Sequence, residues 1–486
     1  MIRLNNIKFT YDTGQKIINN INFTINDGEV VLIAGISGSG KSTISKIING
    51  LIPHYYQGHL LGNVFIDKNN SNNLDMVART KLIGNVFQNP KTQFFNNDLE
   101  SEIAFTLENL GVDPIVIREK VDNTILEFEL EYLKDQLLHQ MSGGQKQKIA
   151  CASAVINSNK IIILDEPSSN LDYKSTNDLK DILLKLKKQG KTIIINEHRL
   201  YYLKDIIDRL IVINDGNIIL DLNYNEILKL NDQYLNNTGL RSLNPFNTNI
   251  KDKIVNNSHS LIIDNLRFNY GKKEVLNINN FKFEFKGVVG IIGPNGAGKT
   301  TFINTLAGIL KVRSGSFIID GKKYHQKELQ NKAYIVSQDV NHQLFMESVI
   351  DELLSMKDVS LDKAMKILVK LGLNEKKDQH PMSLSMGEKQ RLAIALAFVS
   401  QKQIIIFDEP TSGLDYYHML QTKELLDDLV SLNKIVFVIT HDIEFIFKTC
   451  NQILEINDGS ITKEFILNNH TKDRLISSFK HIKERT

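Results

Sequence analysis

The chain has 486 residues, of which 42% are hydrophobic and 23% charged, and its formal net charge is +2. This length allows two or more domains with separate cores, and the near-neutral charge gives no support for binding to nucleic acid or to an anionic membrane. Two cysteines exclude a disulfide framework and favour a reducing compartment. The apolar runs are too short for a membrane helix, and the first residues lack a signal-peptide pattern.

The predicted elements follow the same order in both halves of the chain. Alternating apolar and polar residues predict a pair of antiparallel strands at the start of each half. Helices and short, nearly continuous apolar strands then alternate, which indicates a largely parallel sheet buried on both faces. The predicted antiparallel strands cover 2–10, 17–25, 261–269 and 275–285, the helical regions 43–51, 98–139, 301–310 and 347–379, and the apolar strands 161–164, 193–195, 404–407 and 435–439.

Two glycine-rich segments fit the phosphate-loop pattern G-x-x-x-x-G-K-S/T, and each follows an apolar run typical of a buried strand. Glycines in such a loop turn backbone N–H groups inward, and the next helix directs its positive end at the phosphates. The pattern also predicts that the lysine reaches the phosphates and that the next hydroxyl binds Mg²⁺. The candidate nucleotide-binding residues are Gly35, Ser37, Gly38, Gly40, Lys41, Ser42, Thr43, Gly293, Asn295, Gly296, Gly298, Lys299, Thr300 and Thr301.

A strand in each half ends in paired carboxylates, at the edge where α/β sheets bind ligands. We expect Asp165 and Asp408 to hold Mg²⁺, and the adjacent Glu166 and Glu409 to orient the attacking water and accept its proton. A histidine stands 32 positions after each glutamate. These two histidines, His198 and His441, are predicted to contact the γ-phosphate and the attacking water.

Ahead of each carboxylate strand, a serine and at least one glycine open a predicted helix, over 146–156 and 389–399. A hydroxyl and bare N–H groups at the positive end of a helix form a phosphate contact. A helix cap alone explains the serine, but not why the pattern precedes both carboxylate pairs. The residues concerned are Ser142, Gly143, Gly144, Ser385 and Gly387.

Together these motifs resemble those of ATP-binding cassette (ABC) proteins with two fused cassettes. The resemblance implies an α/β fold of two tandem ABC-type P-loop NTPase domains, each with an antiparallel β subdomain and a helical subdomain, that bind ATP and Mg²⁺ and hydrolyse ATP. We expect the first domain over 1–224, a linker with one helix at its start over 225–258, and the second domain over 259–486.

In this family, ATP lies between the phosphate loop of one cassette and the serine motif of the other. The resemblance therefore implies that Ser385 and Gly387 complete the first site, and that Ser142, Gly143 and Gly144 complete the second. It also implies that Gln88 and Gln338 contact nucleotide and Mg²⁺, and that Tyr11 and Tyr270 stack on adenine, with an edge-strand aromatic as the alternative. Three positions depart from the family pattern: Lys148 replaces arginine, Met386 a glycine and Glu388 a glutamine. We expect two hydrolytic sites, and Met386 places the first site in question.

Residues 84–95 and 98–105 are similar to the glutamine-loop region of energy-coupling factor (ECF) ATPases, which power bacterial uptake of vitamins and of cobalt or nickel. This implies a peripheral protein on the cytoplasmic side of the cell membrane. Its partners would be a transmembrane coupling (T) protein and small substrate-binding (S) membrane proteins, with no nucleic acid. The candidate docking residues are Phe94, Phe95, Leu344 and Phe345, with Glu100 and Glu102 as partners for basic residues. Packing in the core is the alternative for the apolar ones.

The sequence offers two alternatives to this function. A duplicated ABC ATPase acting on the ribosome would typically carry a long charged arm between its cassettes, whereas this linker is short, rich in asparagine and almost neutral. A pair of cassettes that only binds nucleotide is opposed by the intact Asp-Glu pairs. The transported substrate, and whether the cassettes pair within one chain or between two chains, are left open by the sequence.

Overall fold

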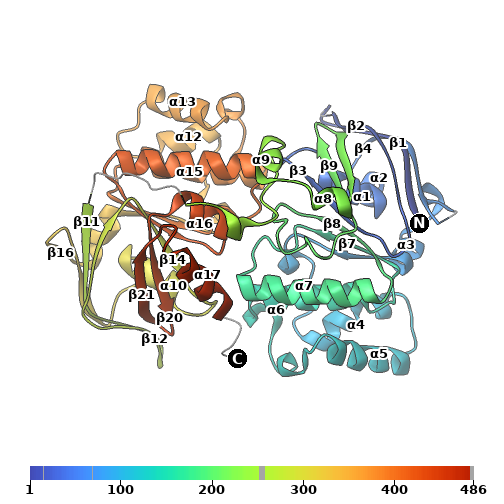
Figure 1. The fold of residues 1–486 in the computed structure, drawn as a ribbon, viewed down its shortest axis with the longest axis horizontal. Helices are drawn as coiled ribbons and strands as arrows, with labels where there is room; N and C mark the ends of the chain where they lie inside the picture. The colour runs from blue at the N-terminus through green and yellow to red at the C-terminus, as the bar shows by residue number, and fades with distance from the viewer. Residues whose placement is uncertain (15, 68, 251–257, 482–486) are drawn as a thin grey trace. The chain divides into compact units, whose positions relative to one another are not determined.

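The computed structural model describes residues 1–481 except 15, 68 and 251–257. The chain divides into two compact units, Met1–Leu243 with Asp415–Tyr417, and Asn244–Leu414 with His418–Thr486 (Figure 1). The predicted linker spans this boundary, and its residues 251–257 lie outside the described part. Its beginning holds two short helices, α8 (Tyr224–Ile227) and α9 (Asp232–Asn237), rather than one.

The first unit begins with an antiparallel sheet, as the alternating pattern predicts. Buried and exposed side chains alternate along its first two strands, with one interruption in each, and the buried apolar residues form a core with the first phosphate-loop helix and one face of the central sheet. The strand order is β2 (Lys16–Ile25), β1 (Ile2–Tyr11), β4 (Gly58–Ile66) and β5 (Asn69–Asn70).

The central sheet of the first unit is parallel except at one edge, where β10 pairs antiparallel with β9. Its middle strands are buried along almost their whole length, which confirms the prediction from their continuous apolar runs. The strand order is β10 (Asn217–Asn223), β9 (Arg209–Asn214), β3 (Val30–Gly35), β8 (Thr192–Asn196), β7 (Ile161–Asp165) and β6 (Ile83–Val86).

Helices α1 and α6 of the first unit contact the strands of this sheet. Helices α4 and α5 lie within the helical region predicted over 98–139. In Figure 1, α6 lies beside α7, and α4 packs against both α5 and α6. Cys151 on α6 is buried, and this burial raises the pKa of its thiol to about 12. The helices are α1 (Lys41–Ile48), α2 (Leu51–His54), α3 (Met76–Leu82), α4 (Leu99–Asn109), α5 (Pro114–Glu127), α6 (Gly143–Val155) and α7 (Tyr173–Lys188).

The second unit repeats the arrangement of the first, but one predicted strand is divided. The strand predicted over 275–285 is two strands, β12 and β13, which pair with successive parts of β11 and are separated by Asn279 and Asn280. Asparagine is depleted in strands, and two in succession break the ladder here. The antiparallel strands are β11 (Ser258–Tyr270), β12 (Lys273–Ile278), β13 (Phe281–Lys286), β15 (Ser314–Ile319) and β16 (Lys322–Tyr324).

The second central sheet has the same arrangement as the first, with an antiparallel strand at one edge. Its order is β17 (Ala333–Val336), β18 (Ile404–Asp408), β19 (Ile435–Ile439), β14 (Val288–Ile292), β20 (Gln452–Asn457) and β21 (Ser460–Ile466). The helices are α10 (Lys299–Leu306), α11 (Gln326–Lys332), α12 (Val349–Leu354), α13 (Leu361–Lys370), α14 (Met386–Val399), α15 (Tyr416–Ser431), α16 (Ile443–Thr449) and α17 (Lys472–His481).

Candidate functional site

The two phosphate loops connect a buried strand to a helix, as the sequence predicts. The first joins β3 to α1 and the second joins β14 to α10. Each helix is preceded by a glycine in the left-handed region, Gly40 with φ 108° and Gly298 with φ 97°. A residue with a Cβ would be strained at these angles, so the glycines allow the chain to turn sharply into the helix.

The lysine of each phosphate loop bends back over its own loop. Nζ of Lys41 donates to the carbonyl oxygens of Gly35 and Ile36 at 3.0 and 2.9 Å, and Nζ of Lys299 donates at 2.8 Å to Gly293 and to the residue after it. Burial lowers the pKa of the Lys41 ammonium, although nearby carboxylates oppose this shift. Both cations are thus held over a glycine-rich loop.

A hydroxyl and a carboxylate meet at the start of each phosphate-loop helix. Oγ of Ser42 donates to Oδ1 of Asp165 at 3.0 Å. Burial raises the pKa of Asp165, and it raises the pKa of Asp408 to about 6 against the opposing effects of Lys299 and a hydrogen bond from Thr300. Hydroxyl and carboxylate oxygens are the hard ligands that Mg²⁺ prefers, and one or two carboxylates suffice when phosphates supply the others. The residues present therefore fit a magnesium ion.

The second carboxylate of each pair lies next to its histidine. Nε2 of His198 is 3.5 Å from Oε1 of Glu166, and Nε2 of His441 is 3.7 Å from Oε1 of Glu409. Nε2 of Gln88 donates to the other oxygen of Glu166 at 2.6 Å. The structure thus brings together glutamine, glutamate and histidine in the first unit, and glutamate and histidine in the second.

Both glutamates have a strained backbone conformation. Their φ angles are 44° for Glu166 and 51° for Glu409, in the left-handed region that non-glycine residues rarely adopt. Each is held by a hydrogen bond of 2.9 Å from its N–H, to the carbonyl oxygen of Asn196 and of Ile439 respectively. Both units thus show the same strained conformation, with the same hydrogen bond from the glutamate N–H to the neighbouring strand. This indicates that the end of that strand fixes the direction of the carboxylate.

The environment of Glu166 favours its ionised form. Burial alone would raise the pKa of this carboxyl, but the neighbouring His198, Lys41 and Gln88 outweigh the burial and lower the pKa below its usual value. An ionised carboxylate accepts protons and hydrogen bonds, so Glu166 has the protonation state that a general base requires.

The serine motifs form matching helix caps. In the first unit, Oγ of Ser142 accepts from the N–H of Gln145, and Gln145 accepts in return from the N–H of Ser142 at 2.8 Å. Ser385 and Glu388 form the same capping box in the second unit. Glu388 replaces the glutamine without loss of the cap, since a carboxylate oxygen accepts the same hydrogen bond.

The departure at Met386 leaves the helix start unchanged. Helix α14 begins at Met386 just as α6 begins at Gly143. A Cβ on Gly143 would meet its nearest neighbour, the carbonyl oxygen of Asn170, at 3.5 Å, an ordinary contact. The backbone therefore accepts a side chain at this position. The effect of Met386 on the first nucleotide site stays a prediction.

The two tyrosines predicted to stack on adenine have matching surroundings. Each lies at the end of the first long strand of its unit and packs edge-on against a phenylalanine two residues earlier. The ring centroids are 4.7 Å apart for Tyr11 and Phe9, and 4.9 Å apart for Tyr270 and Phe268. Tyr270 is 54% exposed and Tyr11 is partly buried. The role of these rings stays a prediction.

The four apolar docking candidates divide into two kinds. Phe95 and Phe345 are 76% and 77% exposed. Leu344 is buried, and Phe94 is partly buried and packs against the core of the first unit. The prediction that Leu344 lines a docking groove is therefore wrong, because its side chain is buried, whereas the docking role of the partly buried Phe94 stays a prediction.

Of the two acidic docking candidates, one is buried. Glu102 is 4% exposed and accepts hydrogen bonds from the backbone N–H groups of Phe95 and Asn96, so it does not offer its charge to a partner. Glu100 is exposed and forms an ion pair of 3.1 Å with Lys134. The prediction for Glu102 is therefore wrong.

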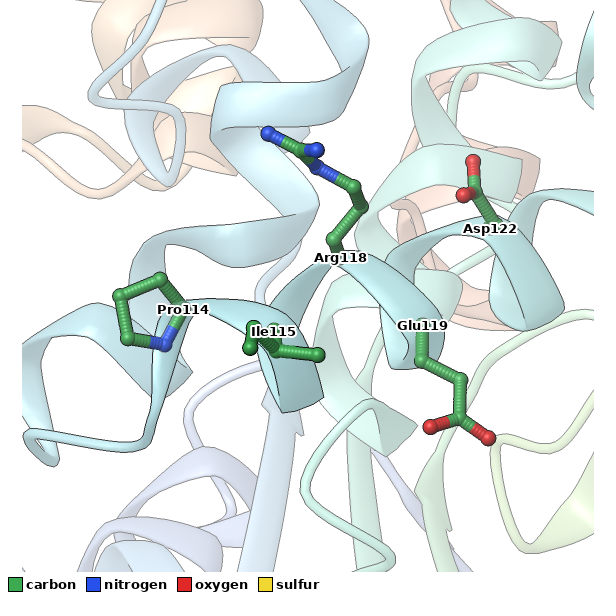
Figure 2. A pocket seen from close by; sticks show the side chains of 5 residues that line it. All are labelled: Pro114, Ile115, Arg118, Glu119 and Asp122. Carbon is green, nitrogen blue, oxygen red and sulfur yellow. The ribbon is translucent and has the colours of Figure 1, made fainter.

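A shallow hollow lies on the outer side of α5 (Figure 2). All the side chains that line it come from this one helix, and none belongs to the predicted nucleotide-binding set. The lining residues are Pro114, Ile115, Arg118, Glu119 and Asp122.

Sequence reasoning did not assign a role to Glu197, which precedes the first histidine and is buried. Its carboxylate accepts from the N–H groups of His198, Arg199 and Ser168 at 2.8, 3.1 and 3.1 Å, and from the hydroxyl of Tyr202 at 2.9 Å. Hydrogen bonds to Glu197 thus connect the backbone of His198 with the segment that follows the carboxylate pair. The sequence signal that could have indicated this role is the position of Glu197, a charged residue directly after a buried strand.

Two units, each with a phosphate loop, an Asp-Glu pair beside a histidine and a capped serine helix, define a tandem P-loop ATPase. A family model described as "ABC transporter" matches residues 18–169 and 276–412, which is more than half of the chain. The chain therefore belongs to the ABC transporter family and carries two tandem ABC cassettes. Cassettes of this family bind ATP, generally with Mg²⁺, and hydrolyse it.

Relatives of this chain match it along almost its whole length. A putative ABC transporter ATP-binding protein of Treponema denticola is 40% identical over 475 residues, 96% of this chain and 97% of that protein. The putative HMP/thiamine import ATP-binding protein YkoD of Bacillus subtilis is 29% identical over 495 residues, 95% of this chain and 90% of that protein. ABC ATP-binding proteins act with transmembrane partners. In the part of this chain that the structure describes, no helix is long and apolar enough to cross a membrane.

A solved structure described as a model of ribosome-bound archaeal Pelota and ABCE1 superposes with a TM-score of 0.70 at 22% identity. The match covers 97% of this chain and 80% of that one. At this level of identity the likeness shows the fold alone.

Proposed function

We propose that this chain is the ATP-hydrolysing, energy-coupling subunit of an ECF-type importer, peripheral on the cytoplasmic face of the cell membrane. The observation that carries the proposal is the pair of strongly exposed phenylalanines, Phe95 and Phe345, which follow the glutamines Gln88 and Gln338 by the same seven positions. Exposed aromatic residues are costly in water and are typical of protein contacts. The name of the YkoD relative, a putative import protein for HMP/thiamine, supports an importer.

The nucleotide roles follow the predicted assignments. Lys41 and Lys299 hold the phosphates of the two ATP molecules with the N–H groups of their loops, and Tyr11 and Tyr270 stack on the adenines. The serine motif of each cassette completes the site of the other. Ser385 and Gly387 thus serve the first site, and Ser142, Gly143 and Gly144 serve the second.

The catalytic roles fall to the strained glutamates. Glu166 and Glu409 orient a water molecule towards the γ-phosphate and take its proton, while His198 and His441 hold the phosphate and the water in place. Bound Mg²⁺ neutralises charge on the phosphate oxygens. The residues that would hold the ion are Ser42, Gln88 and Asp165 in the first unit and Thr300, Gln338 and Asp408 in the second.

ATP binding then drives the conformational change. Since each ATP contacts both cassettes, its binding draws them together, and hydrolysis releases them. We propose that the T protein, docked on Phe95 and Phe345, follows this movement, and that small S proteins carry the substrate. In this proposal, the chain provides the free energy of ATP hydrolysis for transport.

The alternative is a duplicated ABC ATPase that acts on the ribosome. The ABCE1 likeness is a likeness of fold at 22% identity, and the predicted linker carries no long charged arm. We therefore favour the importer.

The test is affinity purification of the tagged chain from its own membranes in mild detergent, followed by mass spectrometry. Recovery of a polytopic membrane protein together with small membrane proteins is the expected result, and the small proteins identify the substrate. A Phe95→Ala/Phe345→Ala variant is the matched control and should lose these partners. Recovery of ribosomal proteins without membrane proteins would overturn the importer in favour of the alternative.

A further inference from the structure

A buried glutamate stands behind each exposed phenylalanine. In the first unit it is Glu102 on α4, which is 4% exposed. Its Oε2 accepts hydrogen bonds from the backbone N–H groups of Phe95 and Asn96, both at 2.9 Å, and from the Asn96 side-chain amide at 3.4 Å. A single carboxylate oxygen therefore holds the turn that carries Phe95.

The second unit has the same arrangement. Glu352 on α12 is 3% exposed, and its Oε1 accepts from the N–H of Phe345 and, at 2.7 Å, from the N–H of Met346. In both units the bonds span seven and six positions along the chain. The sequences of the two turns differ, yet the buried glutamate and its two N–H donors are kept.

Burying a carboxylate has a large desolvation cost unless hydrogen bonds offset it. Burial does raise the pKa of Glu102, while the N–H groups of Asn96 and Phe95 act to lower it. An apolar residue would fill this place in the core without that cost. The arrangement that offsets the cost of Glu102 also fixes the backbone of the turn, so the turn is the feature that the glutamate serves.

Because the turn is fixed, the exposed aromatic side chain that it carries is also fixed in position. Phe94 packs inward on the core while Phe95 points outward and stacks on Phe105, with ring centroids 4.8 Å apart and planes 16° from parallel. A partner that binds such a prearranged ring avoids the entropy cost of ordering a loose loop.

We infer that Glu102 and Glu352 are positioning residues for partner binding: each holds its turn so that Phe95 or Phe345 is presented in one orientation. This inference rests on the proposed function, because it takes the T protein as the partner. Neither glutamate touches the partner. Each acts through the backbone N–H groups of its turn.

The first measurement needs no partner. Chymotrypsin cleaves after phenylalanine, and cleavage requires a turn that can unfold locally. In Glu102→Leu the two N–H groups lose their acceptor, and we expect cleavage after Phe95 to become about tenfold faster, as a loss of about 1.4 kcal/mol implies. Glu102→Gln keeps an acceptor oxygen and should be cleaved at nearly the wild-type rate. Equal cleavage of the wild type and Glu102→Leu would overturn the inference.

The second measurement is the affinity for the T protein recovered with the wild type. We expect Glu102→Leu to weaken binding about tenfold and Glu102→Gln to restore it. In a Phe95→Ala background, Glu102→Leu should add no further loss, because the ring that it positions is gone. If Glu102→Leu weakens binding of the T protein equally in the Phe95→Ala background, Glu102 does not act through Phe95. The same cycle with Glu352 and Phe345 tests the second unit.

The two measurements separate the two proposals. If the wild type recovers no membrane protein, the importer is overturned, and with it the part of the inference that concerns the T protein. Cleavage after Phe95 still decides whether Glu102 holds the turn. If the wild type recovers its partner and Glu102→Leu binds it equally well, the importer stands and the positioning role falls.

Discussion

The side-chain amide of Asn196 donates a hydrogen bond of 2.9 Å to Oδ1 of Asp165, and a second one of 2.9 Å to the hydroxyl of Ser45. At the equivalent positions of the second unit stand two isoleucines, Ile439 for Asn196 and Ile303 for Ser45. Both members of the polar pair are replaced together. This is expected, because replacing one partner alone would leave a buried polar group without its hydrogen bond.

Asn196→Leu should lower the free energy of unfolding by about 1–3 kcal/mol, because it removes the donor from two acceptors in the core of the first unit. Ile439→Leu, at the same position of the second unit, is the matched control. It exchanges apolar groups of similar size and should cost less than about 1.5 kcal/mol. Denaturation in urea measures both. Equal losses in the two variants would mean that the hydrogen bonds of Asn196 contribute nothing.

Glu166→Gln and Glu409→Gln should each lower ATP hydrolysis, by about 10²-fold or more if that site supplies most of the turnover, because an amide does not take the proton of the attacking water. ATP binding should persist, since neither carboxylate is needed to hold the phosphates. Phosphate release and equilibrium binding of ATP measure the two properties separately. Full hydrolysis in both variants would show that neither carboxylate is the general base.

Gly144→Ala should destabilise the first unit, because its Cβ would lie 2.1 Å from Oγ of Ser175. Displacing that side chain costs about 1–3 kcal/mol. Gly387→Ala, at the equivalent position, is the control. The nearest neighbour of its Cβ is Leu414 at 3.8 Å, so it should be neutral or add up to about 1 kcal/mol through helix propensity. The free energy of unfolding of the two variants should thus change in opposite directions or by clearly different amounts.

The buried thiol of Cys151 predicts a loss of stability at alkaline pH. Its pKa is about 12 in the folded protein against 9.0 in the unfolded chain, so the unfolded state alone loses the proton between these values. This contribution to stability is complete below pH 9 and is lost as the pH rises to about 12, at about 1.4 kcal/mol per pH unit. The difference between wild type and Cys151→Ala, measured by denaturation across this range, isolates the thiol. A difference that does not change with pH would contradict the prediction.

The fold was predictable because the chain repeats its own pattern. Alternating and continuous apolar runs gave the two kinds of sheet, and the phosphate loops gave the two buried strands that precede them. The break in the strand over 275–285 was missed because its apolar alternation continues across Asn279 and Asn280. Periodicity records which side chains face the core, but not where the ladder of hydrogen bonds is interrupted.

The site was predictable to the level of the motif. Lys41, Ser42, Asp165 and Glu166 come together because spaced motifs at strand ends meet at one edge of a sheet. The partner-facing residues were predicted less well. Nothing in the residues 94–95 indicates which phenylalanine faces outward, because that depends on the turn held by Glu102.

The position of the two cysteines has a practical consequence. Cys151 and Cys450 are each 2% exposed, and they lie in different units. A thiol that is buried away from solvent is not accessible to maleimides in the folded protein. A cysteine introduced at the surface of each unit can therefore be coupled to a fluorescent dye while both native thiols are kept. Energy transfer between the dyes would then follow the two cassettes through successive rounds of ATP turnover.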